Sequence, residues 1–223
     1  RPPGHHATLE FGMGFCLLNN IAIAASHLVN NLGISPVMII DIDLHHGNGT
    51  QDIFYQDENV HVLSTHQYPF YPGTGEINEV GEGLGSGTNL NIPLPSEAGD
   101  LALIESTETI IIPWLDQIKP QAVLISMGFD GHWMDPLGEL NYSENGYYTF
   151  FKHLSDWIRK ENLPGISLIL EGGYSLDALG ASTLATLNSL LGISHTSILG
   201  FPPEEDKITW KNTLKTIQSN WNL

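Results

Sequence analysis

The chain has 223 residues, 41% of them hydrophobic, which is enough apolar material to bury one sizeable core. Its 8 Lys and Arg residues against 25 Asp and Glu residues give a formal net charge of −17. This balance argues against direct binding to nucleic acid or to an anionic membrane, because both partners require basic surfaces.

The first half of the chain alternates predicted helices and strands. Helical spacing over residues 14–33 precedes an apolar run over 36–44, and a run rich in Val and Ile is typical of a strand covered on both faces. A short helix is expected over 50–56 and a strand over 60–66. After a Gly- and Pro-rich segment, residues 88–94 predict a further strand.

The second half continues the alternation, with strands predicted at 121–129 and 165–173. The helices expected here cover 98–118, 143–161, 175–191 and 204–219. Strands separated by helices imply right-handed crossovers. The sequence therefore predicts a three-layer α/β fold with a mostly parallel sheet.

Four of the predicted strands end in unusual polar residues. The stretches that follow them read "DIDLHHGNG", "STHQYPFYPGTG", "GFDGHWMDPLG" and "EGGYS". Open α/β sheets bind their ligands in the crevice beyond the carboxyl ends of the strands. We therefore expect an active site at this edge of the sheet.

One group of these residues has the chemistry of a metal site. Asp43 and His45 are two positions apart, so in an extended segment both side chains point the same way. Asp130, at another strand end, could supply a third ligand. Two carboxylates and one imidazole leave open positions, which is typical of a catalytic metal site, and they suit Zn²⁺ without excluding Fe²⁺ or Mn²⁺.

Two further features suggest proton transfer beside such a metal. His5 and His6 lie in tandem after a Gly, where they could move protons to and from a water molecule. Tyr174 follows two glycines and could donate a hydrogen bond to a developing oxyanion, although a tyrosine at the edge of the core is the simpler interpretation.

The motifs together resemble those of a known family. "RPPGHHA", "GFCLLNN", "DIDLHHGNGTQ", "FYPGTG", "GFDGHWMDPLG" and "LEGGYS" occur in the order found in the histone deacetylase superfamily, which includes acetylpolyamine amidohydrolases and acetoin-utilisation proteins. The resemblance runs from residue 1 to about residue 190. It implies the arginase-deacetylase fold and a zinc-dependent amidohydrolase that removes acetyl or other acyl groups from lysine side chains or similar alkyl amines.

The resemblance also implies a role for each matching residue. His6 matches the general base, His5 its charged partner, and Tyr174 the phenol that polarises the acyl carbonyl. Asp41 and Asn48 match the residues that hold His5 and His6, and because Asn48 replaces an Asp of the class I pattern, His6 should be held less strongly in its charged form. The metal ligands match Asp43, His45 and Asp130, for Zn²⁺ or Fe²⁺.

Two more sets of residues follow from the same resemblance. The substrate tunnel and its surroundings match Gly14, Phe15, Tyr71, Leu137, Gly172 and Gly173. A site for a monovalent cation, expected to be K⁺, matches Asp41, Asp43, His45, Ser64 and Thr65. His46 has no catalytic counterpart, and we interpret it as structural.

The family domain normally has strands ahead of the first motif, and none is present in this sequence. We therefore interpret residues 1–223 as a fragment of a single deacetylase domain, with a C-terminal helical segment at 193–223. In the family order the absent strands lie outside the strand at 36–44, so that strand is expected to become an exposed edge.

Rival functions remain open. One is a non-catalytic fragment or pseudo-enzyme that binds acyl-lysine. Another is a dinuclear ureohydrolase of the same fold, which is disfavoured because His132 stands where a second carboxylate is needed. A zinc peptidase is disfavoured because no His-Glu-x-x-His helix is present.

Compartment and partners are constrained only broadly. The single cysteine, Cys16, excludes a disulfide framework and a cysteine-rich zinc module. With no membrane-spanning run and no signal peptide at the start, a cytoplasmic setting is expected. An acetylated protein, an acetylated peptide and a small acylated amine all fit as substrates, and the oligomeric state stays open.

Overall fold

The computed structural model describes residues 1–205 and 209–223, which group into two compact units. The first unit consists of Arg1–Pro93, Gln117–Gly128 and Gly165–Gly172. The second consists of Leu94–Asp116, Phe129–Pro164 and Gly173–Leu223. The expectation of a single domain over 1–223 stays a prediction, and each unit is described by itself.

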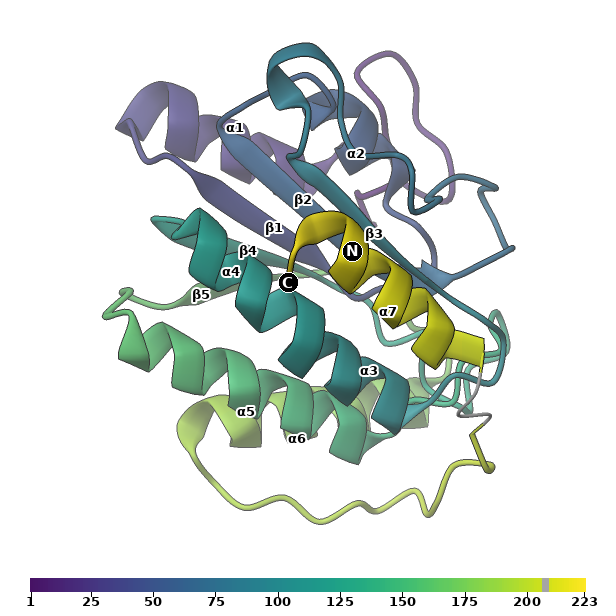
Figure 1. Ribbon diagram of the computed structural model, residues 1–223. Helices are drawn as coiled ribbons and strands as arrows, with labels where there is room; N and C mark the ends of the chain where they lie inside the picture. Colours follow the sequence, from purple (N-terminus) through teal and green to yellow (C-terminus); the bar gives the residue numbers. More distant parts are fainter. Residues whose placement is uncertain (206–208) are drawn as a thin grey trace. The chain divides into compact units, whose positions relative to one another are not determined.

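The first unit is built on a five-stranded sheet with the order β3-β2-β1-β4-β5 (Figure 1). β1 pairs in parallel with β2 and β4, and β4 pairs in parallel with β5. The prediction of an α/β fold with a mostly parallel sheet is therefore confirmed. The strands are β1 (Val37–Asp41), β2 (Val60–Gln67), β3 (Asn89–Leu94), β4 (Ala122–Met127) and β5 (Ile166–Leu170).

The expectation that the strand at 36–44 becomes an exposed edge is wrong. β1 is the central strand, hydrogen-bonded on both sides, and all five of its residues are buried. The edges of the sheet are β3 and β5. In β5, Ser167 is exposed and the other four residues are only partly buried. Strand order depends on pairing between distant segments, which the hydrophobic pattern of one segment does not encode.

The predicted strand at 36–44 continues three residues too far, because the ladder ends where the carboxylates begin. The N–H of Asp43 donates to Asp41 Oδ1 at 3.0 Å, and the N–H of His45 donates to Asp43 Oδ1 at 2.8 Å. Short carboxylate side chains that bind nearby backbone compete with sheet pairing. Asp41, the last residue of β1, lies level with Ser64 of β2 and Ser126 of β4, and both of these strands continue beyond that point.

Helix α1 (Asn20–Leu32) begins later than predicted. Gly14 and Phe15 have positive φ values of 54° and 66°, which a right-handed helix does not allow. The side chain of Asn19 then caps the helix by accepting the N–H of Ala22 at 3.0 Å. α1 contacts β1 and β4, and α2 (Asn48–Phe54) contacts β2, which gives the sheet its helical cover within this unit.

The second unit is mainly helical. α5 contacts α3 and α6, and α7 contacts α3 and the π-helical turn η2. Its elements are α3 (Asp100–Ser106), η2 (Thr107–Ile111), α5 (Glu144–Lys160), α6 (Leu176–Leu191) and α7 (Thr209–Trp221), while α4 (Ile112–Ile118) continues from it into the first unit. Residues 206–208 of the predicted segment 204–219 lie outside the described residues.

The helix predicted over 98–118 is interrupted by η2 just ahead of Pro113. Pro113 has no N–H to donate to the preceding turn, and a widened turn at that point adapts the chain to the missing hydrogen bond. Trp114, which follows, packs edge-on against Trp221 of α7 with ring centroids 5.5 Å apart.

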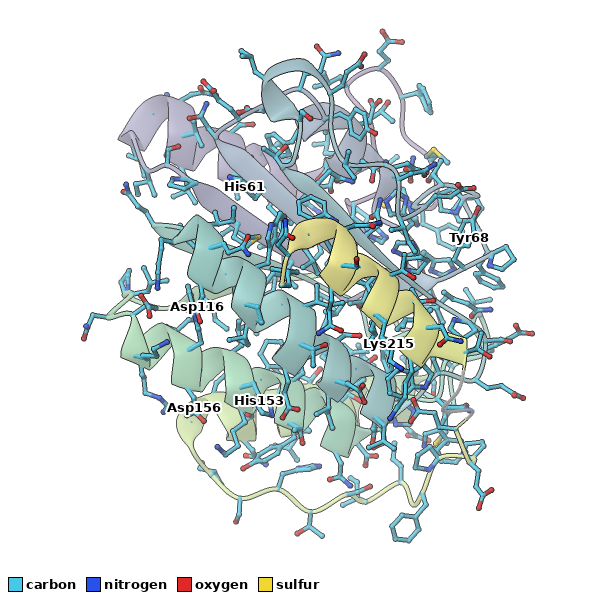
Figure 2. All side chains as sticks on the ribbon, viewed as in Figure 1. His61, Tyr68, Asp116, His153, Asp156 and Lys215 are labelled. Atoms are coloured by element: carbon cyan, nitrogen blue, oxygen red, sulfur yellow. The ribbon has the colours of Figure 1, made fainter. Side chains whose placement is uncertain are left out.

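The outer face of α5 shows how a strongly acidic chain places its few basic residues. Asp156, labelled in Figure 2, accepts hydrogen bonds from Lys152 at 2.8 Å and from Arg159 at 2.8 Å. Asp116, also labelled, accepts the indole N–H of Trp157 at 3.0 Å.

In the described part of the chain, no helix is long and apolar enough to cross a bilayer.

The cap of α1 generates a stability prediction. Besides capping, the Asn19 amide donates to the carbonyl of Ala7 and to Thr50 Oγ1, and its side chain is buried. Asn19→Ala removes the cap and leaves buried acceptors without donors, so it should lower the free energy of unfolding by about 2 kcal/mol in urea titrations. Asn20→Ala is the control, because Asn20 is exposed and donates one bond, to Pro2; an equal loss there would contradict the assignment.

Candidate active site

The carboxyl end of β1 brings two candidate metal ligands together. Asp43 is buried with 1% exposure, and Asp43 Oδ1 lies 3.2 Å from His45 Nδ1. Both side chains belong to the segment that leaves the sheet ladder, where the N–H groups of Asp43 and His45 donate to the carboxylates of Asp41 and Asp43. This arrangement fixes the direction in which the carboxylate and the imidazole point.

The second oxygen of Asp43 is held from the far side of β4. The N–H of Gly172, just after β5, donates to Asp43 Oδ2 at 2.9 Å. β4 lies between β1 and β5, and the bond passes Gly128, where an added Cβ would collide with Asp43. A residue without a side chain at position 128 is therefore needed for this contact.

His5 is paired with a buried carboxylate. His5 Nδ1 lies 2.9 Å from Asp41 Oδ2, and His5 Nε2 lies 3.7 Å from Asp43 Oδ1. Burial opposes the charged imidazole, but the charges of Asp41 and Asp43 outweigh it and raise the pKa of His5 well above its usual value. His5 is therefore protonated at neutral pH.

His6 has the opposite character, although its ring centroid is only 4.0 Å from that of His5. Its Nδ1 lies 2.8 Å from the neutral amide oxygen of Asn48. Burial and the neighbouring positive charge of His5 lower the pKa of His6 to about 3. His6 is therefore neutral at neutral pH, and with Nδ1–H donating to the Asn48 oxygen, its Nε2 carries the unshared electron pair.

Two aromatic side chains lie beside His6 and His45. The ring centroid of Tyr71 lies 5.2 Å from that of His6 and 6.0 Å from that of His45. Phe70, which the sequence reasoning did not single out, lies 5.6 Å from His45. Phe15 is 71% exposed at a positive φ of 66°, an unfavourable conformation for a bulky residue and one that occurs at functional sites.

His46 belongs to a buried polar network, in agreement with a structural role. Its Nδ1 lies 2.7 Å from Thr74 Oγ1, and its Nε2 lies 3.0 Å from Gln51 Oε1. His66 Nε2 lies 2.9 Å from the carbonyl oxygen of Gly75. These contacts attach the segment that carries Tyr71 to the body of the first unit.

The remaining residues of the expected cation site lie at the end of β2. Ser64 and Thr65 are buried, and Ser64 Oγ lies 2.9 Å from His66 Nδ1. The structure thus places Ser64 level with Asp41 across the β1–β2 pairing. The K⁺ site itself stays a prediction.

Four expected site residues belong to the second unit. Asp130 is buried with 1% exposure and follows β4 by three residues, and Leu137 is exposed. Tyr174 follows Gly173, which has a positive φ of 118°. The Tyr174 backbone is held within this unit, because its N–H donates to Asp135 Oδ2 at 2.6 Å.

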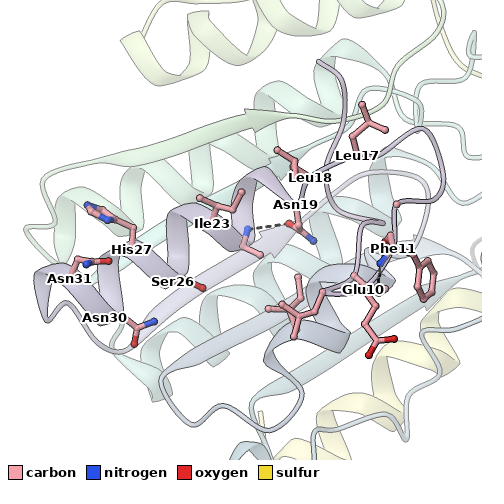
Figure 3. A pocket seen from close by; sticks show the side chains of 15 residues that line it. Glu10, Phe11, Leu17, Leu18, Asn19, Ile23, Ser26, His27, Asn30 and Asn31 are labelled. Carbon is pink, nitrogen blue, oxygen red and sulfur yellow. Dashed lines mark hydrogen bonds between the residues drawn. The ribbon is translucent and has the colours of Figure 1, made fainter.

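One cavity of the first unit lies apart from these residues. It measures about 600 Å³ and lies along α1 beneath the segment at 8–18 (Figure 3). Its lining residues include Leu17, Leu18, Ile23 and the helix-capping Asn19. None of the candidate catalytic side chains is among its described lining residues.

The sequence reasoning missed two buried carboxylates in the polar motifs. Glu171 is fully buried and accepts the N–H groups of Gly4 at 2.6 Å and His5 at 3.1 Å, together with the hydroxyl of Ser126 at 3.0 Å. Asp135 is the second. Each stands inside a quoted motif, "LEGGYS" or "GFDGHWMDPLG", and an acidic residue within an otherwise apolar or Gly-rich motif is the signal that could have identified it.

Comparisons with known proteins agree with this geometry. The model of a family described as "Histone deacetylase domain" matches residues 1–190. The chain is 45% identical over 193 residues to "Histone deacetylase 14, chloroplastic" of Arabidopsis thaliana, covering 86% of this chain and 45% of that protein. It is 41% identical over 199 residues to a "Probable deacetylase" of Archaeoglobus fulgidus, covering 89% of this chain and 55% of that protein.

A solved structure shows the same fold. The crystal structure of the HDA15 HD domain aligns with a TM-score of 0.86 at 37% identity, covering 98% of this chain and 59% of that one. The chain thus spans about half the length of the curated relatives that it matches, with 45% of the first and 55% of the archaeal protein covered.

The hydrogen bonds of Glu171 generate a prediction. Glu171→Ala removes the acceptor for three buried donors, so it should lower the free energy of unfolding by about 3 kcal/mol or more. Glu171→Gln should cost about 1 kcal/mol, because its carbonyl can still accept from the backbone and the Ser126 hydroxyl can rotate to accept its amide. Urea titrations measure both, with the exposed Glu58→Ala as control; equal losses for Ala and Gln would contradict this account.

Proposed function

The chain belongs to the histone deacetylase family, and on that basis we propose that it hydrolyses the amide bond of acetylated lysine side chains or similar acylated alkyl amines with the help of one bound divalent cation. The observation that carries the proposal is the pair of adjacent histidines with different partners, since His5 Nδ1 lies 2.9 Å from an Asp41 carboxylate oxygen and His6 Nδ1 lies 2.8 Å from the Asn48 amide oxygen. A charged His5 and a neutral His6 lie beside the Asp43 carboxylate, and amide hydrolysis needs both a proton acceptor and positive charge near the developing oxyanion.

The chemistry of the first unit fits a divalent cation. Two ligands bound to one ion at about 2.0–2.2 Å lie roughly 3–3.6 Å apart, and the separation of Asp43 Oδ1 and His45 Nδ1 falls in this range at 3.2 Å. Three buried carboxylates, those of Asp41, Asp43 and Glu171, are accompanied by one charged imidazole. A cation would offset the excess negative charge, which is costly to bury.

Asp130 is our proposed third ligand, and the chain itself limits where it can lie. Gly128 is the last residue of the central segment of the first unit and is in contact with Asp43. Asp130 follows two residues later, so its Cα lies within about 7 Å of the Gly128 Cα by covalent geometry alone. With two carboxylates and one imidazole the ion keeps open positions, as catalytic sites require. We propose Zn²⁺, with Fe²⁺ as an alternative for the same donors.

We assign the reaction steps to the side chains as follows. When bound, the divalent cation supplies Lewis acidity that polarises the acyl carbonyl and acidifies a water molecule. His6, neutral at neutral pH, accepts the proton of the attacking water and returns it to the leaving amine. His5 stays charged and stabilises the tetrahedral oxyanion, and the Tyr174 hydroxyl donates a second hydrogen bond to it.

The rim of the site supports a linear, unbranched acylated amine as substrate. Flat aromatic faces such as Phe15 and Tyr71 accept a methylene chain by apolar contact, and we propose that they form the walls of the tunnel with Gly14 and Gly172. Leu137 and Gly173 are proposed to line its outer part. The amine product is cationic, which suits a chain with a net charge of −17.

The rival functions receive less support. A ureohydrolase needs a second metal near Asp130, but His132 Nε2 lies 3.6 Å from Glu144 Oε2 and its Nδ1 accepts the N–H of Met134 at 3.1 Å. A non-catalytic acyl-lysine binder would not need the two histidines in opposite protonation states. The K⁺ site on Asp41, Asp43, His45, Ser64 and Thr65 and the cytoplasmic setting stay predictions.

The proposal is tested by metal content and turnover together. The protein is prepared with any sequence that naturally flanks it and is reconstituted separately with Zn²⁺ and with Fe²⁺. It should then hold one ion per chain and release acetate from an acetyl-lysine peptide or an acetylated polyamine. Asp130→Ala should lose both the metal and the activity, because a site with three protein ligands has no spare donor. Elemental analysis and an acetate-release assay measure the two.

The control is Asp52→Ala, which removes an exposed carboxylate of α2 and should keep both properties. Two tightly held ions per chain would contradict the single-ion site. Full metal binding without turnover on any acylated amine would favour the non-catalytic binder instead.

Tyr174 gives a second prediction. Removing one hydrogen-bond donor to an oxyanion typically lowers kcat about 10²–10³-fold. Tyr174→Phe should therefore lower kcat on the best acylated amine by this order, as measured by steady-state kinetics. Its metal content, measured by elemental analysis, and its thermal midpoint, measured by differential scanning calorimetry, should not change. A Phe variant with the wild-type kcat would show that the phenol takes no part in the reaction.

A further inference from the structure

Asp135 stands out in the second unit as a buried carboxylate whose hydrogen bonds come from the backbone of two separate segments. It is 6% exposed. Its Oδ2 accepts the N–H of Tyr174 at 2.6 Å and the N–H of Ser175 at 3.0 Å, and its Oδ1 accepts the N–H of Leu137 at 3.1 Å. One carboxylate thus fixes the main chain at the proposed oxyanion donor and at the proposed rim of the tunnel.

Asp135 binds the backbone directly after Gly173, a residue whose conformational freedom would otherwise leave the Tyr174 side chain without a fixed direction. Tyr174 is preceded by Gly173 at φ 118°, a conformation that only glycine adopts easily, and is followed by Ser175, the N-cap of α6. A glycine hinge leaves the direction of the following side chain undetermined unless its backbone is held. The negative charge is also favourable here, because it faces the first N–H groups ahead of α6.

We propose that Asp135 is a positioning residue for the Tyr174 phenol, an inference that rests on the proposed function. It does not touch the substrate. Its bonds to Tyr174 and Ser175 hold the main chain after the Gly173 hinge, so that the phenol is aimed before the substrate arrives. Charge-assisted hydrogen bonds to a carboxylate are about twice as strong as neutral ones, which suits a residue that must keep the backbone after Gly173 in one conformation.

The bond to Leu137 links the rim to the same anchor. Because Leu137 and Tyr174 share one carboxylate, the outer contact with the substrate and the oxyanion donor keep a fixed relation within this unit. Loss of Asp135 should therefore act on the chemical step more than on binding, since the apolar walls assigned to Phe15 and Tyr71 belong to the first unit.

A double-mutant cycle tests the proposal. A misplacement of about 1 Å in a catalytic group can cost about 10²-fold, so Asp135→Ala should lower kcat about 10- to 10²-fold while KM changes less than about threefold. In the Tyr174→Phe background the same substitution should lower kcat less than about twofold, because its effect acts through the missing hydroxyl. Equal losses in both backgrounds would overturn the proposal.

A graded variant guards against a simple failure to fold. Asp135→Asn keeps one oxygen that can accept from Tyr174 and Ser175 but turns its amide toward the N–H of Leu137, so its kcat should fall between those of the wild type and the Ala variant. Asp100→Ala is the matched control. Asp100 is a partly buried carboxylate of the same unit that accepts the N–H and hydroxyl of Ser143, so its loss should lower the thermal midpoint without a selective loss of kcat.

A measurement independent of turnover separates this proposal from the proposed function. The amide hydrogens of Tyr174 and Ser175 should exchange with solvent at least about tenfold faster in Asp135→Ala than in the wild type or in Asp100→Ala. Unchanged exchange would overturn the positioning role even in an active enzyme. If exchange is faster in Asp135→Ala but the wild-type protein does not deacetylate any substrate, the anchor is confirmed and the proposed reaction is rejected.

Discussion

The hydrogen bond from the Gly172 N–H to the Asp43 carboxylate is the contact on which the arrangement of the first unit depends. It joins the ends of β1 and β5 across β4, and it is possible only because Gly128 presents no side chain at the crossing. The residue before Gly172 is Glu171, whose carboxylate holds the backbone of Gly4 and His5. One two-residue segment therefore holds both the proposed metal ligand Asp43 and the backbone of His5.

The electrostatics of this centre follow from which partner each histidine has. His5 and His6 are adjacent in sequence and both buried, but His5 faces the carboxylate of Asp41 and His6 faces the amide of Asn48. A carboxylate stabilises an imidazolium, whereas a neutral amide oxygen does so much less, and the charge on His5 opposes a second charge on His6. The two rings, whose centroids lie 4.0 Å apart, therefore differ in their preference for the charged form, which suits the proposed roles of His5 and His6.

Buried carboxylates satisfied by backbone N–H groups recur through the chain. Glu171 holds Gly4 and His5, Asp135 holds Tyr174, and Glu144 accepts the N–H groups of Ile198 and Leu199 at 3.0 Å and 3.1 Å. Such contacts allow an acidic chain with only 8 Lys and Arg residues to bury negative charge without a basic partner for each one. They fix loops by a direction-specific bond, which apolar packing alone does not provide.

The sequence by itself determined the strands, the polar residues that follow them and the class of chemistry. Apolar runs such as 36–44 identify buried strands, and the Asp43–His45 spacing places two ligands on one side of an extended segment, because both properties depend only on near neighbours. The match of six motifs in order extended this to a family. The roles given to single residues remain proposals that these local patterns support.

Only the tertiary structure decided how distant segments combine. It made β1 the centre of the sheet and β5 an edge, where the sequence reasoning expected the opposite for β1. It also gave Glu171 and Asp135 their partners, which lie up to 167 residues away for Glu171 and 40 residues away for Asp135. The partner of a buried carboxylate is set by which strands and loops come to lie side by side, and no local pattern of residues records that order.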